Sequence, residues 1–208
     1  MSELDLTPEQ RDALQEVANI GMGQAGAALA RILDTLVRLS IPRIQVIHAA
    51  NLEASINAMM GPDTDDVTAV RQSFRSDLEG EAIVVYGEAG CAGLWDLMGY
   101  EHGHESPGPG VARELLLDVA NILIGACIGS IFQQLGRSLS FSAPSLVGQN
   151  VPVARLLDSS SLPWKVALLL EVNFSLKDRH FTCHLLTLMP EASIRIVKRA
   201  LDDALNGL

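Results

Sequence analysis

Residues 11–20 read RDALQEVANI, and residues 113–122 read RELLLDVANI. The two segments align without a gap at an offset of 102 residues, and the same offset places Pro42 on Pro144. A match of this length that includes polar positions is improbable by chance, so it indicates an internal repeat. The chain is therefore predicted to contain two copies of one unit.

Each copy is expected to begin with a long helix. The segment Thr7-Pro8-Glu9-Gln10 places a capping Thr before a Pro at the first helical position, with a Gln three residues after the Thr. Apolar residues at helical spacing allow this helix to run to about Leu36. The second helix is expected to start near Pro109 and run to Leu135, with Gly136 as its C-cap.

A strand, a hairpin and a closing helix are expected after each long helix. Their predicted ranges are 37–47, 67–88 and 91–98 in the first half, and 139–147, 165–188 and 191–205 in the second. This pattern predicts an α/β fold of the α+β type: a pseudo-twofold two-layer sandwich with two long helices packed on a largely antiparallel sheet. Residues 1–208 are interpreted as one domain of two similar α-β-ββ-α repeats, about 7–99 and 107–208.

Composition excludes several classes of partner. The chain has 15 Lys and Arg against 25 Asp and Glu, a net charge of −10, so neither nucleic acid nor an anionic membrane surface is an expected partner. The uncharged stretch 119–136 contains Asn and Gln, so we interpret it as a central helix whose glycines, Gly125 and Gly129, allow another element to approach closely. The N-terminus lacks the apolar core of a signal peptide, and a cytoplasmic protein is expected.

Metal and disulfide sites are not expected. The cysteines Cys91, Cys127 and Cys183 are far apart and odd in number, which predicts buried free thiols. His102 and His104 stand in the predicted linker between the halves, and no nearby cysteine completes a metal site with them.

The long helices each carry three polar residues at spacing i, i+4, i+7, which places them on one helix face. They are Asp12, Glu16 and Asn19 in the first helix, and Glu114, Asp118 and Asn121 in the second. Two carboxylates and an amide are costly to bury without partners, so this face is expected to be exposed. Asn is a poor helix former, and its repetition at the same position favours a functional role.

A carboxylate one helical turn from a carboxamide can hold a cationic group and orient a water molecule. The face offers no Ser or Cys nucleophile and no His base, so covalent catalysis is not indicated. Positioning catalysis on a substrate carried by another protein fits better.

The doubled pattern acid-x3-acid-x2-Asn-x22-Pro, together with the run of residues 16–23, EVANIGMG, resembles the CheC/CheX/FliY family of chemotaxis phosphatases over nearly the whole chain. The resemblance implies a substrate, the aspartyl phosphate of a CheY-like response regulator. It also implies that Asn19 and Asn121 orient the attacking water and that Glu16 contacts the regulator, through its active-site Lys. Any Mg²⁺ in this reaction belongs to the regulator, and no cofactor is expected on this chain.

The second motif departs from the family pattern. Asp118 stands where the family prefers Glu, and its carboxylate is one methylene shorter; the first acid also changes, from Asp12 to Glu114. The acids Asp12 and Glu114 are expected to contact the partner. The first site is predicted to be complete, and the second to be weaker or altered.

Two other functions remain open from the sequence. One is a non-catalytic CheC-like adaptor that binds a receiver domain or a CheD-like deamidase. The other is an oligomerisation unit whose polar stripes pair between chains. Release of phosphate distinguishes the enzyme from the adaptor, and a dimer that buries both asparagines would favour the oligomerisation unit.

Overall fold

The structure is a computed structural model. It describes residues 4–33, 36–48, 51, 54–55, 57–58, 66–87, 91, 108–152, 166–176 and 182–206. The helices and strands that form the fold in the described part of the chain are α1 (Pro8–Leu33), β1 (Val37–Leu39), β2 (Arg43–His48), β3 (Asp66–Arg75), β4 (Glu79–Gly87), α4 (Pro109–Gln134), β5 (Ser140–Phe141), β6 (Ser145–Pro152), β7 (Val166–Leu176), β8 (Thr182–Pro190) and α6 (Glu191–Asn206).

The strands form one eight-stranded sheet in which every pairing is antiparallel. Its order is β1-β7-β8-β4-β3-β5, with β2 also paired to β7 and β6 also paired to β3. The hairpins β3–β4 and β7–β8 thus meet at the centre through β4 and β8, and each outer strand pairs with the hairpin of the other half. The predicted fold class is confirmed. The internal repeat, which this arrangement parallels, stays a prediction from the sequence.

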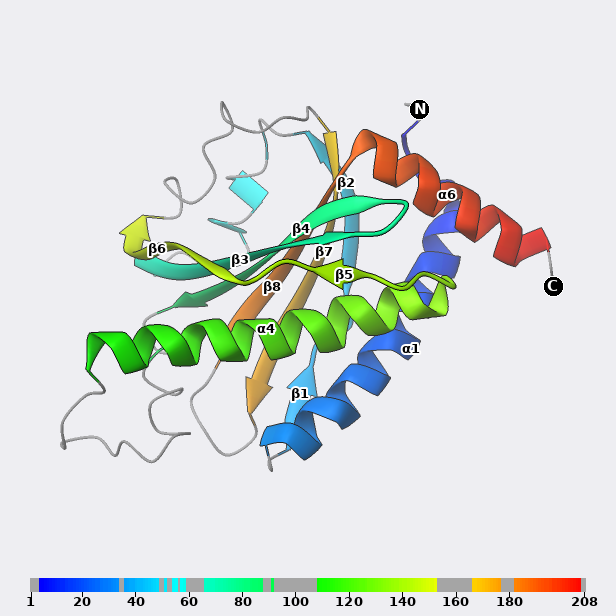
Figure 1. The fold of residues 1–208 in the computed structure, drawn as a ribbon. Coiled ribbons are helices and arrows are strands. Elements are labelled where there is room, and N and C mark those ends of the chain that lie inside the picture. Colours follow the sequence, from blue (N-terminus) through cyan, green and yellow to red (C-terminus); the bar gives the residue numbers. More distant parts are fainter. Residues whose placement is uncertain are drawn as a thin grey trace.

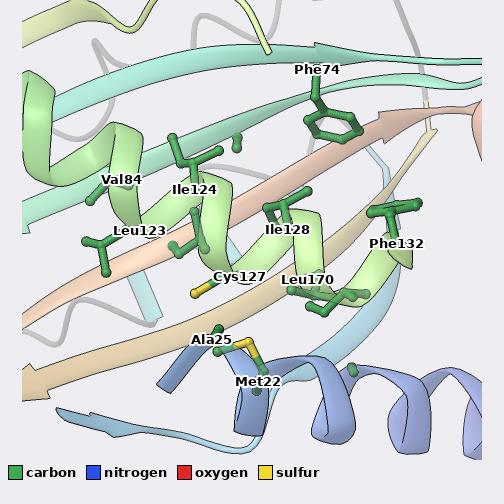
Figure 2. Packing of buried hydrophobic residues seen from close by; sticks show 14 of the residues in the cluster. Met22, Ala25, Phe74, Val84, Leu123, Ile124, Cys127, Ile128, Phe132 and Leu170 are labelled. Atoms are coloured by element: carbon green, nitrogen blue, oxygen red, sulfur yellow. The ribbon is translucent and has the colours of Figure 1, made fainter. Parts of the chain in front are cut away.

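Helices α1, α4 and α6 lie together on one side of the sheet, with α4 crossing the central strands and α1 beside it (Figure 1). Their apolar side chains and those of the sheet form one core cluster. Figure 2 shows Ile124, Ile128 and Phe132 of α4 in this core, with Met22 and Ala25 of α1 below them. Burial of the aliphatic stripe on each helix is the main force that holds the two motif helices on the sheet.

Helix α4 is long and apolar enough to cross a membrane, by length and composition, over Gly110–Gln134. Half of its most apolar window is buried inside the protein, where Leu116, Ala120 and Ile124 are almost fully covered. The contacts of this helix with the sheet and with α1 agree with its interpretation as a central core helix.

The close approach between the two long helices occurs at Gly21 of α1. A Cβ at this position would lie 2.7 Å from both the Cα and the N of Ile131 in α4. The prediction that Gly125 and Gly129 allow another element to approach α4 closely is wrong, because an added Cβ at either position meets no atom within 4 Å. The crossing point of the helices decides which glycine is needed, and the GxxxG spacing of α4 lies away from it.

The N-terminus of α1 carries the predicted capping box. The Gln10 backbone N–H donates to Thr7 Oγ1, and the Thr7 N–H donates to Gln10 Oε1, both at 3.1 Å. Gln10 is buried, and its Nε2 also donates to Asp202 Oδ1 of α6 at 2.7 Å. The cap therefore fixes the start of the first motif helix to the C-terminal helix.

Replacing Thr7 with alanine should remove one of the two reciprocal bonds and lower the free energy of unfolding by about 1 kcal/mol. Urea unfolding followed by circular dichroism measures the change. Thr7→Ser keeps the hydroxyl acceptor and serves as the control. Equal midpoints for the alanine and serine variants would contradict a stabilising cap.

Other predicted boundaries differ from the structure. Each of the strands expected over 37–47 and 139–147 is split in two, with breaks at 40–42 and 142–144, where a proline lacks the N–H that a ladder needs. Helix α1 ends at Leu33 rather than near Leu36. Helix α4 ends at Gln134, one residue before the predicted end, and its C-cap is Leu135 rather than Gly136, which follows directly with a φ of 69°. Most of the closing helix predicted over 91–98 and most of the linker lie outside the described residues.

Candidate functional site

All six predicted motif residues lie on exposed helix surface, as the sequence analysis expects: Asp12, Glu16 and Asn19 on α1, and Glu114, Asp118 and Asn121 on α4. Four residues of helix separate the two acids of a motif by about 6 Å along the axis, and the Asn follows about 4.5 Å further on. Each triplet thus presents two carboxylates and an amide along one edge of its helix.

The two triplets form separate sites. Gly21, two residues after Asn19, packs on Ile131 of α4. Asn121 precedes Ile131 by ten residues, which is about 15 Å along a helix. One partner active site therefore engages one triplet at a time.

The motif carboxylates have no ion-pair partner among the described residues; the pairs Arg71–Glu81 and Arg137–Asp77 involve other acids. Exposed acids that pair with no cation in this part of the chain keep their charge available for a partner. In the first motif, Asn19 Oδ1 accepts a bond from Gln15 Nε2, one turn earlier, at 3.2 Å on the exposed surface.

A groove of about 570 Å³ lies beside Asn19. Its lining brings the motif residues Asn19 and Pro42 together, and small α1 residues such as Gly23 and Ala27 form its floor. The apolar side chains of Leu36 and Ile41 also line it, and Ile41 is 73% exposed. The first motif thus combines acids and an amide with an uncovered apolar surface, a combination typical of a protein-binding site.

The corresponding surface of the second half is different. A hollow of about 560 Å³ is lined by polar and small residues, among them Ser130, Gln133 and Arg137, and neither Asn121 nor Pro144 is part of its lining. The groove beside Asn19 thus includes the motif Pro of its half, whereas this hollow includes neither motif residue of the second half.

Asn121 has a partner on the sheet instead. Its Oδ1 accepts a bond from Gln72 Nε2 of β3 at 2.8 Å, and the same Nε2 donates to the Ser142 carbonyl oxygen at 2.7 Å. Gln72 is only 2% exposed. Sequence reasoning does not find Gln72, since its only signal is a polar residue between the apolar inward positions Val70 and Phe74 of β3.

The thiols take no part in either site. The cysteines are free, as predicted; Cys127 and Cys183 are buried and Cys91 is half-buried. Burial raises the pKa of the Cys127 thiol to about 12, so it stays protonated and unreactive at neutral pH. His102 and His104 lie outside the described residues. Among the residues described, no group of three or more His, Cys, Asp or Glu could hold a metal ion.

Comparison with known proteins supports the resemblance drawn from the motif. The model of the CheC-like family matches residues 9–44, which span the first motif helix, the groove and Pro42. The fold is similar to that of FliY from Thermotoga maritima, with a TM-score of 0.70 and 18% identity over 95% of this chain and 98% of that chain.

Two other solved structures share the fold. One is FliM in the FliM–SpeE complex from H. pylori, with a TM-score of 0.63 and 9% identity over 96% of this chain and 97% of that chain. The other is the chemotaxis protein CheX from Desulfovibrio desulfuricans, with a TM-score of 0.51 and 12% identity over 83% of this chain and 99% of that chain. At these identities the likeness establishes the architecture, and the chemistry has to be argued from the motif residues.

Proposed function

We propose that this CheC-like chain dephosphorylates the aspartyl phosphate of a CheY-like receiver domain, in chemotaxis or a related two-component pathway. A role related to chemotaxis is supported by the family match over the first motif helix and by the FliY-like fold. The cytoplasm, where receiver domains act, is the proposed location. The observation that carries the proposal is the pair of exposed acid-acid-Asn triplets on the surface of two core helices.

The reaction needs only one water molecule. Water attacks the phosphorus of the aspartyl phosphate in line with the leaving carboxylate oxygen, and the products are the free Asp side chain and inorganic phosphate. An amide suits the orientation of this water, because it offers an oxygen that accepts a bond from the water and an NH₂ that donates one. Asn19 and Asn121 are the proposed water-orienting residues.

The acids are proposed to hold the partner. Glu16, one turn before Asn19, is placed to pair with the active-site Lys of the receiver, and Asp118 takes the same role in the second motif. Asp12 and Glu114 extend the contact by a further turn. The Mg²⁺ of the reaction is proposed to stay on the receiver, so this chain contributes positioning and charge.

A receiver domain phosphorylated by a small-molecule phosphodonor tests the proposal. After the donor is removed, phosphate release is followed with and without this chain at one tenth of the receiver concentration. We expect the phosphorylated receiver to decay faster and each chain to release many phosphates. Decay at the intrinsic rate, at a chain concentration that saturates binding, would contradict the phosphatase and support the adaptor.

The acids of the two motifs predict a change in apparent affinity. Replacing Glu16 with Gln removes the charge that faces the receiver's Lys and should raise KM at the first site about tenfold, which equals 1.4 kcal/mol, with little change in kcat. Asp118→Glu restores the missing methylene and should lower KM at the second site. Glu9→Gln, at an exposed position outside the motif, is the control; equal KM values for E16Q and E9Q would contradict the role of Glu16.

A non-catalytic adaptor is the second candidate function. The observation that favours it is that a solved structure with this fold is a FliM–SpeE complex, in which the two proteins are bound to each other. For this chain, the partner would be a receiver domain or a CheD-like deamidase seated on the apolar groove. Binding without accelerated release of phosphate is the result that this alternative predicts.

A further inference from the structure

A buried glutamine of the sheet lies beneath the second motif. Gln72 is on β3, is 2% exposed and contacts Asn121 of α4 through its side-chain nitrogen. Its Oε1 is buried, and no described residue donates a hydrogen bond to it. A buried amide with an unpaired oxygen lowers stability relative to an apolar residue of similar size. Packing therefore gives no reason for a glutamine at this position.

The hydrogen bonds fix the orientation of both amides. The Ser142 main-chain carbonyl can only accept, so the Gln72 atom 2.7 Å from it must be the nitrogen. Both hydrogens of that nitrogen are then used, one toward Ser142 and one toward Asn121. The Asn121 atom that faces Gln72 must consequently be its oxygen, and the NH₂ of Asn121 is left without a bond to the sheet. Ser142 is itself held to β3, since its N–H donates to the Ser73 carbonyl at 2.9 Å.

The first motif lacks this arrangement. At one edge of the sheet Phe74 pairs with Phe141, and at the opposite edge Phe174 pairs with Leu39, the residue that the offset of 102 places on Phe141. Phe174 is thus the counterpart of Phe74. Two residues earlier in each strand, Val172 is the counterpart of Gln72. A valine cannot donate a hydrogen bond to Asn19. Instead, among the described residues the side chain of Asn19 is bonded by Gln15 of its own helix, at a longer 3.2 Å.

We propose that Gln72 is a positioning residue for Asn121. It holds the amide of the second motif in one orientation, whereas the amide of Asn19 has only the longer bond from a side chain of its own helix, and so rotates more readily. This inference rests on the proposed phosphatase function, since it assigns a role to Asn121 in that reaction. A water-orienting amide that is already fixed loses no rotational freedom when the receiver docks. The second motif, with its short Asp118, thus has a preorganised Asn that the first motif does not have.

Side-chain NMR tests the positioning independently of any activity. In the free protein, the ¹⁵NH₂ group of Asn121 should show higher order than that of Asn19. Gln72→Met, which is nearly isosteric and cannot donate, should reduce the order of Asn121 to the level of Asn19. Gln72→Val copies the other half and is the second variant, should the methionine disturb packing. Gln149→Met, the same change at an exposed position of β6, should leave Asn121 as ordered as in the wild type.

Kinetics in the Asn19→Ala background test the consequence for the reaction, because only the second motif is then intact. Adding Gln72→Met should lower kcat on the order of tenfold with KM for the phosphorylated receiver unchanged, whereas Gln149→Met should change neither. A general loss of structure would instead lower the thermal midpoint, which should stay at or above the wild-type value in Gln72→Met.

The outcomes distinguish the positioning role of Gln72 from the proposed phosphatase function of the second motif. Loss of order at Asn121 together with a lower kcat supports the positioning role. Unchanged order in both Gln72 variants, or lost order with unchanged kcat, overturns it. If the Asn19→Ala protein never dephosphorylates the receiver faster than the receiver's intrinsic decay, the second motif is not catalytic and Gln72 has no role in the reaction. The NMR result still decides whether Gln72 holds the amide of Asn121.

Discussion

Replacing Asn19 and Asn121 together with alanine is expected to reduce receiver dephosphorylation by on the order of 10²-fold or more. Both side chains are exposed, so their truncation removes the water-orienting amides without opening a cavity. Alanine is the better helix former, but at position 121 it also leaves one hydrogen of the buried Gln72 amide without its acceptor. The double variant should therefore lose about 1–2 kcal/mol of stability and is assayed well below its thermal midpoint. A time course of phosphate release, sampled by quenching at intervals and at a saturating concentration of phosphorylated receiver, measures the loss of activity.

The single variants and a matched control complete this experiment. Asn19→Ala and Asn121→Ala should each keep part of the activity, because the triplets are separate sites on two helices, and Asn121 lies about 15 Å along α4 from the point where α1 packs on it. Asn206→Ala, an exposed asparagine at the end of α6, should have wild-type activity. A double variant that works as fast as the Asn206 control would mean that the amides do not take part in the reaction.

Among the glycines of the motif helices, Gly21 is the one whose replacement with alanine is expected to reduce stability most. The new Cβ would lie 2.7 Å from two main-chain atoms of Ile131, which cannot rotate away, so α1 and α4 would have to separate. Overpacking of this kind costs about 2–3 kcal/mol. The free energy of unfolding from urea titration measures the effect.

Gly23 offers the matched control two residues further along α1. An added Cβ at Gly23 meets nothing within 4 Å, and the position is exposed. Gly23→Ala should therefore raise the free energy of unfolding by about 0.5–1 kcal/mol through helix propensity alone. If Gly21→Ala also stabilised the protein, the close packing of α1 on α4 at this point would be wrong.

Local signals in the sequence predicted much of the fold. The Thr7–Gln10 capping box, the hairpin around residues 76–78 and the end of α4 within two residues of Gly136 each depend on neighbouring residues, and the structure contains all three. The exposed face of both motifs also follows from helical spacing. The two strands interrupted by Pro42 and Pro144 were mispredicted as continuous because the alternation of apolar residues outweighed the missing proline N–H.

Contacts between distant segments could not be predicted in this way. The choice of Gly21 rather than Gly125 for the helix crossing depends on where α1 and α4 meet, which no local pattern specifies. The bond from Gln72 to Asn121 joins residues 49 apart and needs α4 to lie over β3. The groove beside Asn19 likewise forms only when residues 36–42 return along α1. These tertiary contacts make the two motifs unequal, although their sequences are alike.

The most direct test of the account is the number of phosphates that each chain releases from a phosphorylated receiver domain. The wild-type chain, at a tenth of the receiver concentration, is compared with the chain that carries alanine at both Asn19 and Asn121. We predict many turnovers per wild-type chain and a rate close to the receiver's own decay for the double variant. Equal rates for the two proteins, whether fast or slow, would contradict catalysis by the motif asparagines.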